Sequence, residues 1–107
     1  MIERGNLFAD IPQQLAREAV TTLASAPAIR IERIVSRGQA SAAEFWYDQP
    51  QAEWVMVLAG AATVTFEGEG TVQLAPGDYL HIAAHQRHRV DWTDPAQATV
   101  WLAVHYG

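Results

Sequence analysis

Apolar and polar side chains alternate in short runs from residue 29 to the end of the chain. In the run 63–67, Val64 and Phe66 alternate with polar neighbours, a period of two that is typical of a strand with one buried face. Turn-forming residues separate such runs at intervals of about 8 to 12 residues. The predicted strands are 29–36, 44–48, 54–58, 63–67, 71–74, 79–82, 87–93 and 99–106. This pattern predicts an all-β sandwich or barrel.

A different period precedes the strands. Leu15, Ala19 and Leu23 recur every four residues, behind a potential cap at Asp10. Pro27 ends the segment. We therefore expect a short amphipathic helix that packs on the barrel and leaves Arg17, Glu18 and Thr21 on its outer side. The expected division of the chain is an N-terminal segment, 1–28, and a β-barrel domain, 29–107.

Composition narrows the chemistry. The chain has 107 residues, no cysteine and no lysine, which excludes disulfides, thiolate ligands and Schiff bases. Its net charge of −5 disfavours a nucleic-acid partner. The longest apolar stretch, 54–62, is about half the length of a membrane-spanning helix. No signal-peptide pattern is visible in 1–10, so we expect a soluble, cytoplasmic protein with no membrane partner.

One histidine and one glutamate are predicted to meet inside the barrel. In the run 87–93, His88 alternates with charged neighbours and shares its face with Val90 and Trp92. Glu53 shares its face with Val55 on an inner strand. A buried carboxylate must be paired, protonated or bound to a cation. Glu53 and His88 are therefore expected to form either a hydrogen-bonded pair or two ligands of one ion.

The second half of the chain resembles the second motif of the cupin superfamily. That motif consists of a glycine, five residues, proline-x-glycine, two residues and a histidine. The chain has the same spacing in Gly77, the five residues 78–82, Ala83-Ala84-His85, two residues and His88. Ala83 replaces the proline, His85 the glycine and Trp92 the final asparagine. The resemblance implies a jelly-roll barrel and places His88 on the family's metal-ligand histidine.

The first cupin motif is present only in part. Glu53 and Gly60 match its glutamate and glycine, but its two histidines are absent. Their places are held by Trp46 and Asp48 if the gap before the glutamate is four residues, or by Tyr47 and Gln49 if it is three. The resemblance implies a divalent metal, and the imidazole and carboxylate donors suit zinc, manganese or iron(II). The candidate metal ligands are His88, Glu53, Asp48 and His85.

Several further side chains are candidates for a ligand pocket, although most aromatic side chains in a chain this short fill the core. The expected pocket residues are Trp46, Tyr47, Gln49, Trp92 and His105. The register of His105 is open, because both faces of the last strand are apolar, and His81 is expected to face solvent or an interface.

These features leave more than one function open. The first is a barrel that binds a small organic molecule around a metal at Glu53 and His88, with Lewis-acid or oxygen-activating chemistry if it is an enzyme. The alternative is a non-catalytic binding or sensor module without a native metal. An assembly role is a third, since the unpaired strand edges of a sandwich favour pairing, and we expect a homodimer. Catalytic residues and substrate are not determined by the sequence.

Overall fold

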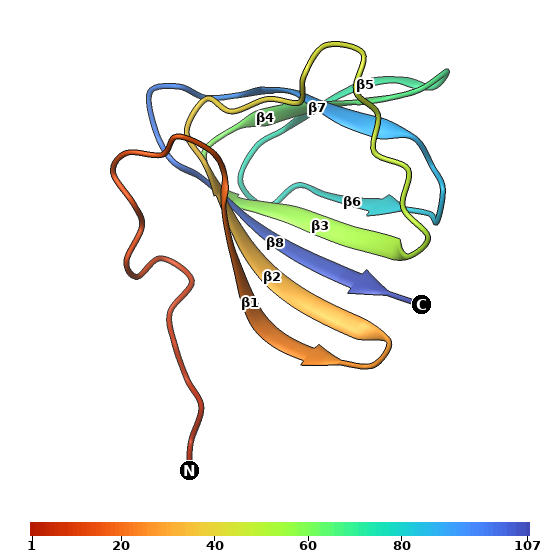
Figure 1. Cartoon of the computed structure of the whole chain (residues 1–107). Helices are drawn as coiled ribbons and strands as arrows, with labels where there is room; N and C mark the ends of the chain where they lie inside the picture. The colour runs from red at the N-terminus through yellow and green to blue at the C-terminus, as the bar shows by residue number, and fades with distance from the viewer.

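The computed structural model describes all residues, 1–107, and contains eight strands in two sheets (Figure 1). The strands are β1 (Ala19–Ala26), β2 (Ile29–Ser36), β3 (Ala52–Ala59), β4 (Ala62–Phe66), β5 (Gly70–Leu74), β6 (Tyr79–Ile82), β7 (His88–Thr93) and β8 (Thr99–Tyr106). The larger sheet has the order β1-β2-β8-β3-β6 and the smaller one the order β5-β4-β7. All pairings are antiparallel. The predicted β-sandwich is confirmed.

The two sheets face one another across a core drawn from both. Alternate residues of β3 point inward, among them the buried Val55 and Val57, and Val64 and Phe66 of β4 meet them from the opposite sheet. Trp101 of β8 belongs to the same apolar cluster. The period-two pattern of the sequence thus corresponds to the inner faces of a two-layer barrel.

The predicted N-terminal helix is wrong. Residues 19–26 form the edge strand β1, which pairs with β2 through a hairpin, and residues 1–18 contain neither helix nor strand. Val20, Thr21 and Thr22 are β-branched and suit a strand, and the backbone of β2 supplies hydrogen-bond partners that no local pattern reveals. Almost all of β1 is exposed, so the four-residue spacing of Leu15, Ala19 and Leu23 does not mark a buried face.

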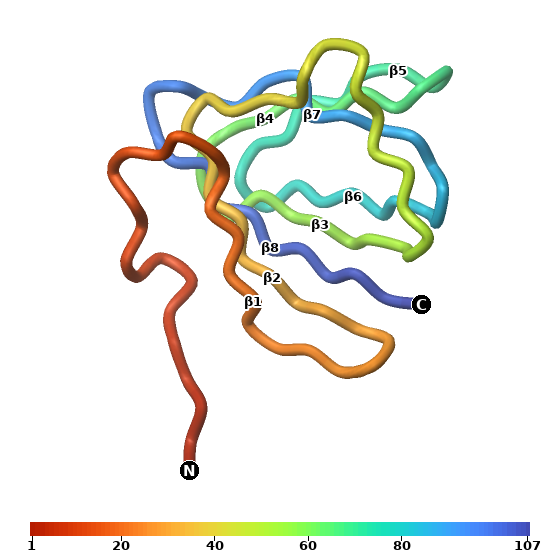
Figure 2. The backbone as a smooth tube through the Cα atoms, in the orientation of Figure 1, coloured from red at the N-terminus to blue at the C-terminus, as the bar shows by residue number.

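The predicted strand at 44–48 is also wrong. Only Tyr47 pairs there, in an isolated antiparallel bridge with His88. The long connection between β2 and β3 instead runs beside β7 of the smaller sheet, where Ser41 and Tyr47 donate backbone hydrogen bonds to Val90 and His88, and then reaches the start of β3 (yellow to yellow-green in Figure 2). No helix in the structure has the length and apolar character needed to span a lipid bilayer.

Candidate functional site

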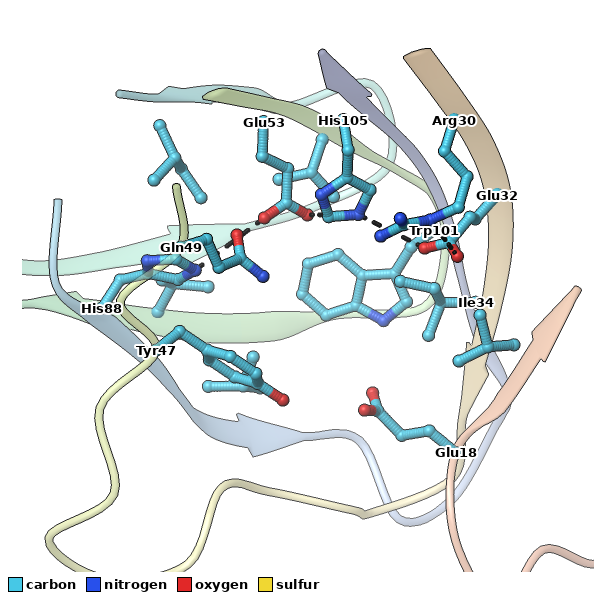
Figure 3. A pocket seen from close by; sticks show the side chains of 15 residues that line it. Glu18, Arg30, Glu32, Ile34, Tyr47, Gln49, Glu53, His88, Trp101 and His105 are labelled. Carbon is cyan, nitrogen blue, oxygen red and sulfur yellow. Dashed lines mark hydrogen bonds and ion pairs between the residues drawn. The ribbon is translucent and has the colours of Figure 1, made fainter. Parts of the chain in front are cut away.

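A cavity of about 210 Å³ lies between the two sheets. Aliphatic side chains such as Val55, Val64 and Ile82 form much of its wall, and charged or polar groups enter it from four elements and two loops (Figure 3). The volume equals that of about seven water molecules at liquid density. It is smaller than the pockets that hold drug-sized molecules, which span roughly 300–1,000 Å³. The cavity therefore has the size and lining of a site for a small polar molecule.

Glu53 lines this cavity. Its position on β3, opposite Ile82 of β6 and His105 of β8, turns the side chain inward, and only 8% of it is exposed. One carboxyl oxygen lies 3.9 Å from Nε2 of His88 and the other 3.8 Å from Nε2 of His105. Both distances are longer than hydrogen bonds. Burial, reinforced by the nearby charge of Glu32, raises the pKa of Glu53 to about 7.

His88, the first residue of β7, faces Glu53 and is 5% exposed. Its Nδ1 lies 2.9 Å from the carbonyl oxygen of Gln86, to which it donates a hydrogen bond. That bond leaves Nε2 as the acceptor nitrogen that points at Glu53. Burial lowers the pKa of His88, so the ring is neutral near pH 7. The structure thus brings the two central residues of the sequence analysis together inside the barrel.

The polar centre continues beyond Glu53 toward β2. His105 is buried, and its Nε2 lies 3.3 Å from one carboxyl oxygen of Glu32, while the other oxygen of Glu32 accepts a 2.7 Å hydrogen bond from Arg30. The register of β8 against β2 and β3, which the sequence left open, places His105 in the cavity. Burial and the nearby charge of Arg30 lower the pKa of His105.

Tyr47 and Gln49 line the cavity, whereas Trp46 and Asp48 do not. The bridge between Tyr47 and His88 fixes this alternation: their backbones exchange hydrogen bonds of 2.7 and 3.2 Å, and the two rings stack at 5.3 Å. The three-residue gap is therefore the one that describes this chain. Tyr47 and Gln49 stand where the cupin motif has its two histidines.

Trp46 points to the outside of the barrel. The guanidinium groups of Arg87 and Arg89 each lie 5.9 Å from the centre of its ring system. These arginines face away from His88, as their alternation with it predicts. The proposed place of Trp46 in the pocket is thus corrected: this side chain takes part in a surface cation–π cluster.

Asp48 and His85 pair with each other at the surface. Their side-chain atoms Oδ1 and Nδ1 lie 2.7 Å apart, and both side chains are exposed. His85 has a positive φ of 62°, the left-handed conformation that suits the glycine of the cupin motif, and its amide donates to the carbonyl of Gln49. Neither side chain lines the cavity that contains Glu53. The expectation that they complete a metal shell does not agree with these positions.

Trp92 also lies outside the cavity, with 43% of the residue exposed. The ladder between β4 and β7 shifts here, because Thr63 pairs with Trp92 and Val64 with Val90. Asp91 is the extra residue of this bulge, and it inverts the alternation of β7. Beyond it Thr93 turns inward instead of Trp92.

Besides aliphatic residues, the cavity wall includes three charged side chains and one tryptophan that the sequence analysis did not place there: Glu18, Arg30, Glu32 and Trp101. Alternation along β2, where Arg30 and Glu32 share a face with Ile34, carried a signal for two of them. Glu18 lies in irregular chain just before β1 and had none.

The side chains present do not form a divalent metal site. No group of three or more histidine, aspartate or glutamate residues converges on one point. Tyrosine and an amide replace the two histidine ligands of the motif, and the two oxygens of Glu53 face different histidines on different strands. Three or four convergent donors hold zinc and similar ions in proteins. This donor set fits a hydrogen-bonding ligand better than an ion.

Fold, site and motif spacing converge on one family. The family described as "Cupin domain" matches residues 34–105, and the chain belongs to it. No curated protein matches the chain at a significant level.

Solved structures include a similar protein from Ralstonia eutropha JMP134, named a "putative mannose-6-phosphate isomerase". It is 51% identical, with a TM-score of 0.96 over 98% of both chains. A cupin superfamily protein from Desulfitobacterium hafniense DCB-2 shares 19% identity, with a TM-score of 0.77 over 99% of this chain and 93% of that one. A protein from Thermus thermophilus shares 20% identity, with a TM-score of 0.80 over 98% of this chain and 97% of that one. The last two similarities support the fold alone.

Proposed function

We propose that this cupin binds a small organic molecule inside its barrel and contacts it directly through Glu53 and His88, without a metal between them. The observation that carries the proposal is the open polar pair: Glu53 and His88 are both buried and face each other at 3.9 Å, with no hydrogen bond joining them. No protein group forms a hydrogen bond to the Glu53 carboxyl oxygens or to Nε2 of His88, and both residues line the cavity. A ligand hydroxyl placed between them can donate to one group and accept from the other.

Tyr47 and Gln49 support the proposal. The Oε1 atom of Gln49 is buried and has no hydrogen-bond partner. Burial and the charges of Glu18 and Glu53 raise the pKa of Tyr47, which keeps its hydroxyl protonated and able to donate. The two residues that replace the motif histidines thus offer one acceptor and one donor to a ligand.

The test is a screen of small metabolites by ligand-observed and protein-observed NMR, on protein stripped of metal with a chelator. The proposal predicts compounds that shift the ring resonances of His88 and Trp101 in the stripped protein. These shifts should disappear in His88→Ala and persist in Asp48→Asn, which changes the surface pair alone. Binding that returns only after addition of zinc, manganese or iron(II) would contradict the proposal.

A second candidate function is proton transfer on a bound hydroxy-carbonyl compound. It is favoured by the pKa of Glu53, about 7, which provides comparable amounts of acid and base at neutral pH. The name of the Ralstonia protein is consistent with aldose–ketose isomerisation. The Glu53 carboxylate would take a proton from the hydroxyl-bearing carbon beside the carbonyl, giving an enediolate; the hydroxyl proton would pass to the former carbonyl oxygen, and Glu53 would return its proton to the former carbonyl carbon. The substrate is only rearranged, so no oxidant is needed.

Isomerisation can be measured directly in D₂O. Mannose or mannose 6-phosphate should acquire deuterium on the carbon beside the carbonyl in the presence of the protein, and Glu53→Gln should lose this exchange. Equal exchange in the variant, or none with the unaltered protein, would leave binding without turnover as the function.

A further inference from the structure

The end of the cavity opposite Glu53 and His88 is formed by Glu18, as Figure 3 shows. This residue precedes β1 and lies outside the part of the chain that matches the family, 34–105. Figure 3 shows its carboxylate in the open space on the side of the Tyr47 hydroxyl. Neither the motifs nor the family resemblance assigns it a role.

A buried hydrogen-bond chain holds the Glu18 carboxylate in place. The Ser36 hydroxyl donates to one carboxyl oxygen at 2.7 Å, and the indole N–H of Trp101 donates to Ser36 Oγ at 3.2 Å. Ser36 and Trp101 are both buried. The anchoring groups come from two strands, β2 and β8, so one carboxyl oxygen of Glu18 is tied to the core of the barrel.

No cation of the protein neutralises Glu18. It takes part in no ion pair, and the one arginine that lines the cavity, Arg30, is already paired with Glu32 at 2.7 Å. Two further hydrogen-bond acceptors belong to residues that line the same cavity. The Oε1 atom of Gln49 has no hydrogen-bond partner, and Nε2 of His88 faces Glu53. The cavity is lined by three carboxyl groups, those of Glu18, Glu32 and Glu53, and by one guanidinium group, that of Arg30, so acidic groups outnumber permanently charged basic ones in its wall.

We propose that Glu18 is a ligand-binding residue that accepts a hydrogen bond from a hydroxyl or ammonium group at the far end of the ligand. The site then takes an unphosphorylated polyhydroxy compound, or its amino derivative, that extends from the Glu53–His88 pair to Glu18. A phosphate at this end would meet the Glu18 carboxylate without a free arginine to balance it. This inference rests on the proposed binding function and adds the class of ligand to it.

Three probes that share one carbon skeleton test the inference: mannose, mannosamine and mannose 6-phosphate. Their dissociation constants for the protein are measured by NMR titration near neutral pH. Mannose and mannosamine should bind at least about ten-fold more tightly than mannose 6-phosphate, and Glu18→Gln should weaken mannosamine about ten-fold or more, the usual cost of a lost hydrogen bond to a charged group. Glu67→Gln, a matched change at an exposed ion pair outside the cavity, should leave all three constants unchanged.

The variants separate the two proposals. If binding is lost in His88→Ala but is the same in Glu18→Gln and the unaltered protein, the role of Glu18 is refuted while the proposed binding function stands. Tighter binding of mannose 6-phosphate than of mannose would refute the ligand class. If none of the probes shifts the Trp101 indole signal of the folded protein at millimolar concentration, the inference is refuted whatever the metabolite screen finds. A screen that finds no cavity ligand at all refutes the proposed function itself. Thermal denaturation confirms that each variant is folded.

Discussion

Replacement of Glu53 by glutamine gives a direct measure of the cost of the buried carboxyl group. Glutamine has nearly the same shape but cannot ionise. The pKa of Glu53 is raised from 4.5 to about 7 in the folded chain, chiefly by burial. Between these values the folded protein binds more protons at this position than the unfolded chain does. The unfolding free energy of the unaltered protein should therefore fall, relative to that of Glu53→Gln, as the pH rises through this window.

The size of the effect follows from the same two pKa values. A rise from 4.5 to about 7, at about 1.4 kcal/mol for each pH unit, corresponds to about 3 kcal/mol. At pH 4.5 and below, where the carboxyl group of the folded protein is protonated, the two proteins should differ little. Above pH 7 Glu53→Gln should be more stable by an amount that approaches this figure and then stays constant.

Urea denaturation of both proteins at a series of pH values from 4.5 to about 8 provides the unfolding free energies. His88 and His105, whose pKa values are lowered by burial, make both proteins less stable below pH 6.5, and this shared contribution cancels in the difference. Glu67→Gln, at an exposed ion pair, is the control and should show no such dependence on pH. A difference between Glu53→Gln and the unaltered protein that stays constant across the range, or that favours glutamate at high pH, would refute the assignment of a buried, poorly paired carboxyl group.

Three further predictions concern the stability of two turns and the oligomeric state of the protein. Gly60→Ala should destabilise the protein by about 2 to 5 kcal/mol in thermal or urea denaturation, because φ is +88° and a Cβ there would lie 2.6 Å from Cα of Thr99. The control Gly68→Ala, at a φ of +77° with open space around it, should lower the unfolding free energy by only about 1 to 2 kcal/mol. Equal losses of stability in the two variants would contradict this explanation. Asp48→Asn should change the unfolding free energy by less than about 1 kcal/mol, because the pair it forms with His85 is exposed, and a larger loss would show that the pair holds the turn. Light scattering should give a mass twice that of the 11.8 kDa chain, as expected for pairing through the exposed edge strand β1, whereas the mass of one chain would contradict the homodimer.

The core and central pair of this protein could be predicted because they depend on local alternation. Period-two patterns in β3, β4 and β7 correspond to inward and outward faces, and they place Glu53 and His88 correctly in the barrel. The alternation fails for Trp92 because Asp91 is an extra residue in β7. A bulge of this kind depends on the partner strand, and no feature of the run 87–93 alone reveals it.

Residues brought in from irregular chain could not be predicted in the same way. Glu18 is held at the cavity by a hydrogen bond from Ser36, 18 residues further along the chain, and Ser36 in turn accepts a hydrogen bond from Trp101, another 65 residues along. Asp48 and His85 likewise meet across 37 residues, at the surface rather than inside. Periodicity describes one element at a time, and such contacts arise only when several elements pack together.

Tyr47 and Gln49 show where a motif and a structure must be combined. The motif left two alternatives for the missing histidines, and the backbone bridge between Tyr47 and His88 decides between them. The residues at those positions are a phenol and an amide, neither of which is a usual ligand of zinc or iron. Of the two possibilities that the sequence leaves open for Glu53 and His88, these residues favour a hydrogen-bonding cavity over a metal centre.

The most direct test of this account is the metal content of the protein after expression in medium supplemented with zinc, manganese and iron, measured by mass spectrometry of the dissolved metal and compared with His88→Ala. We expect far less than one metal ion per chain in both proteins, and equal melting temperatures with and without a chelator. One tightly bound ion per chain that is lost in His88→Ala would contradict the account, because Glu53 and His88 would then be ligands of that ion.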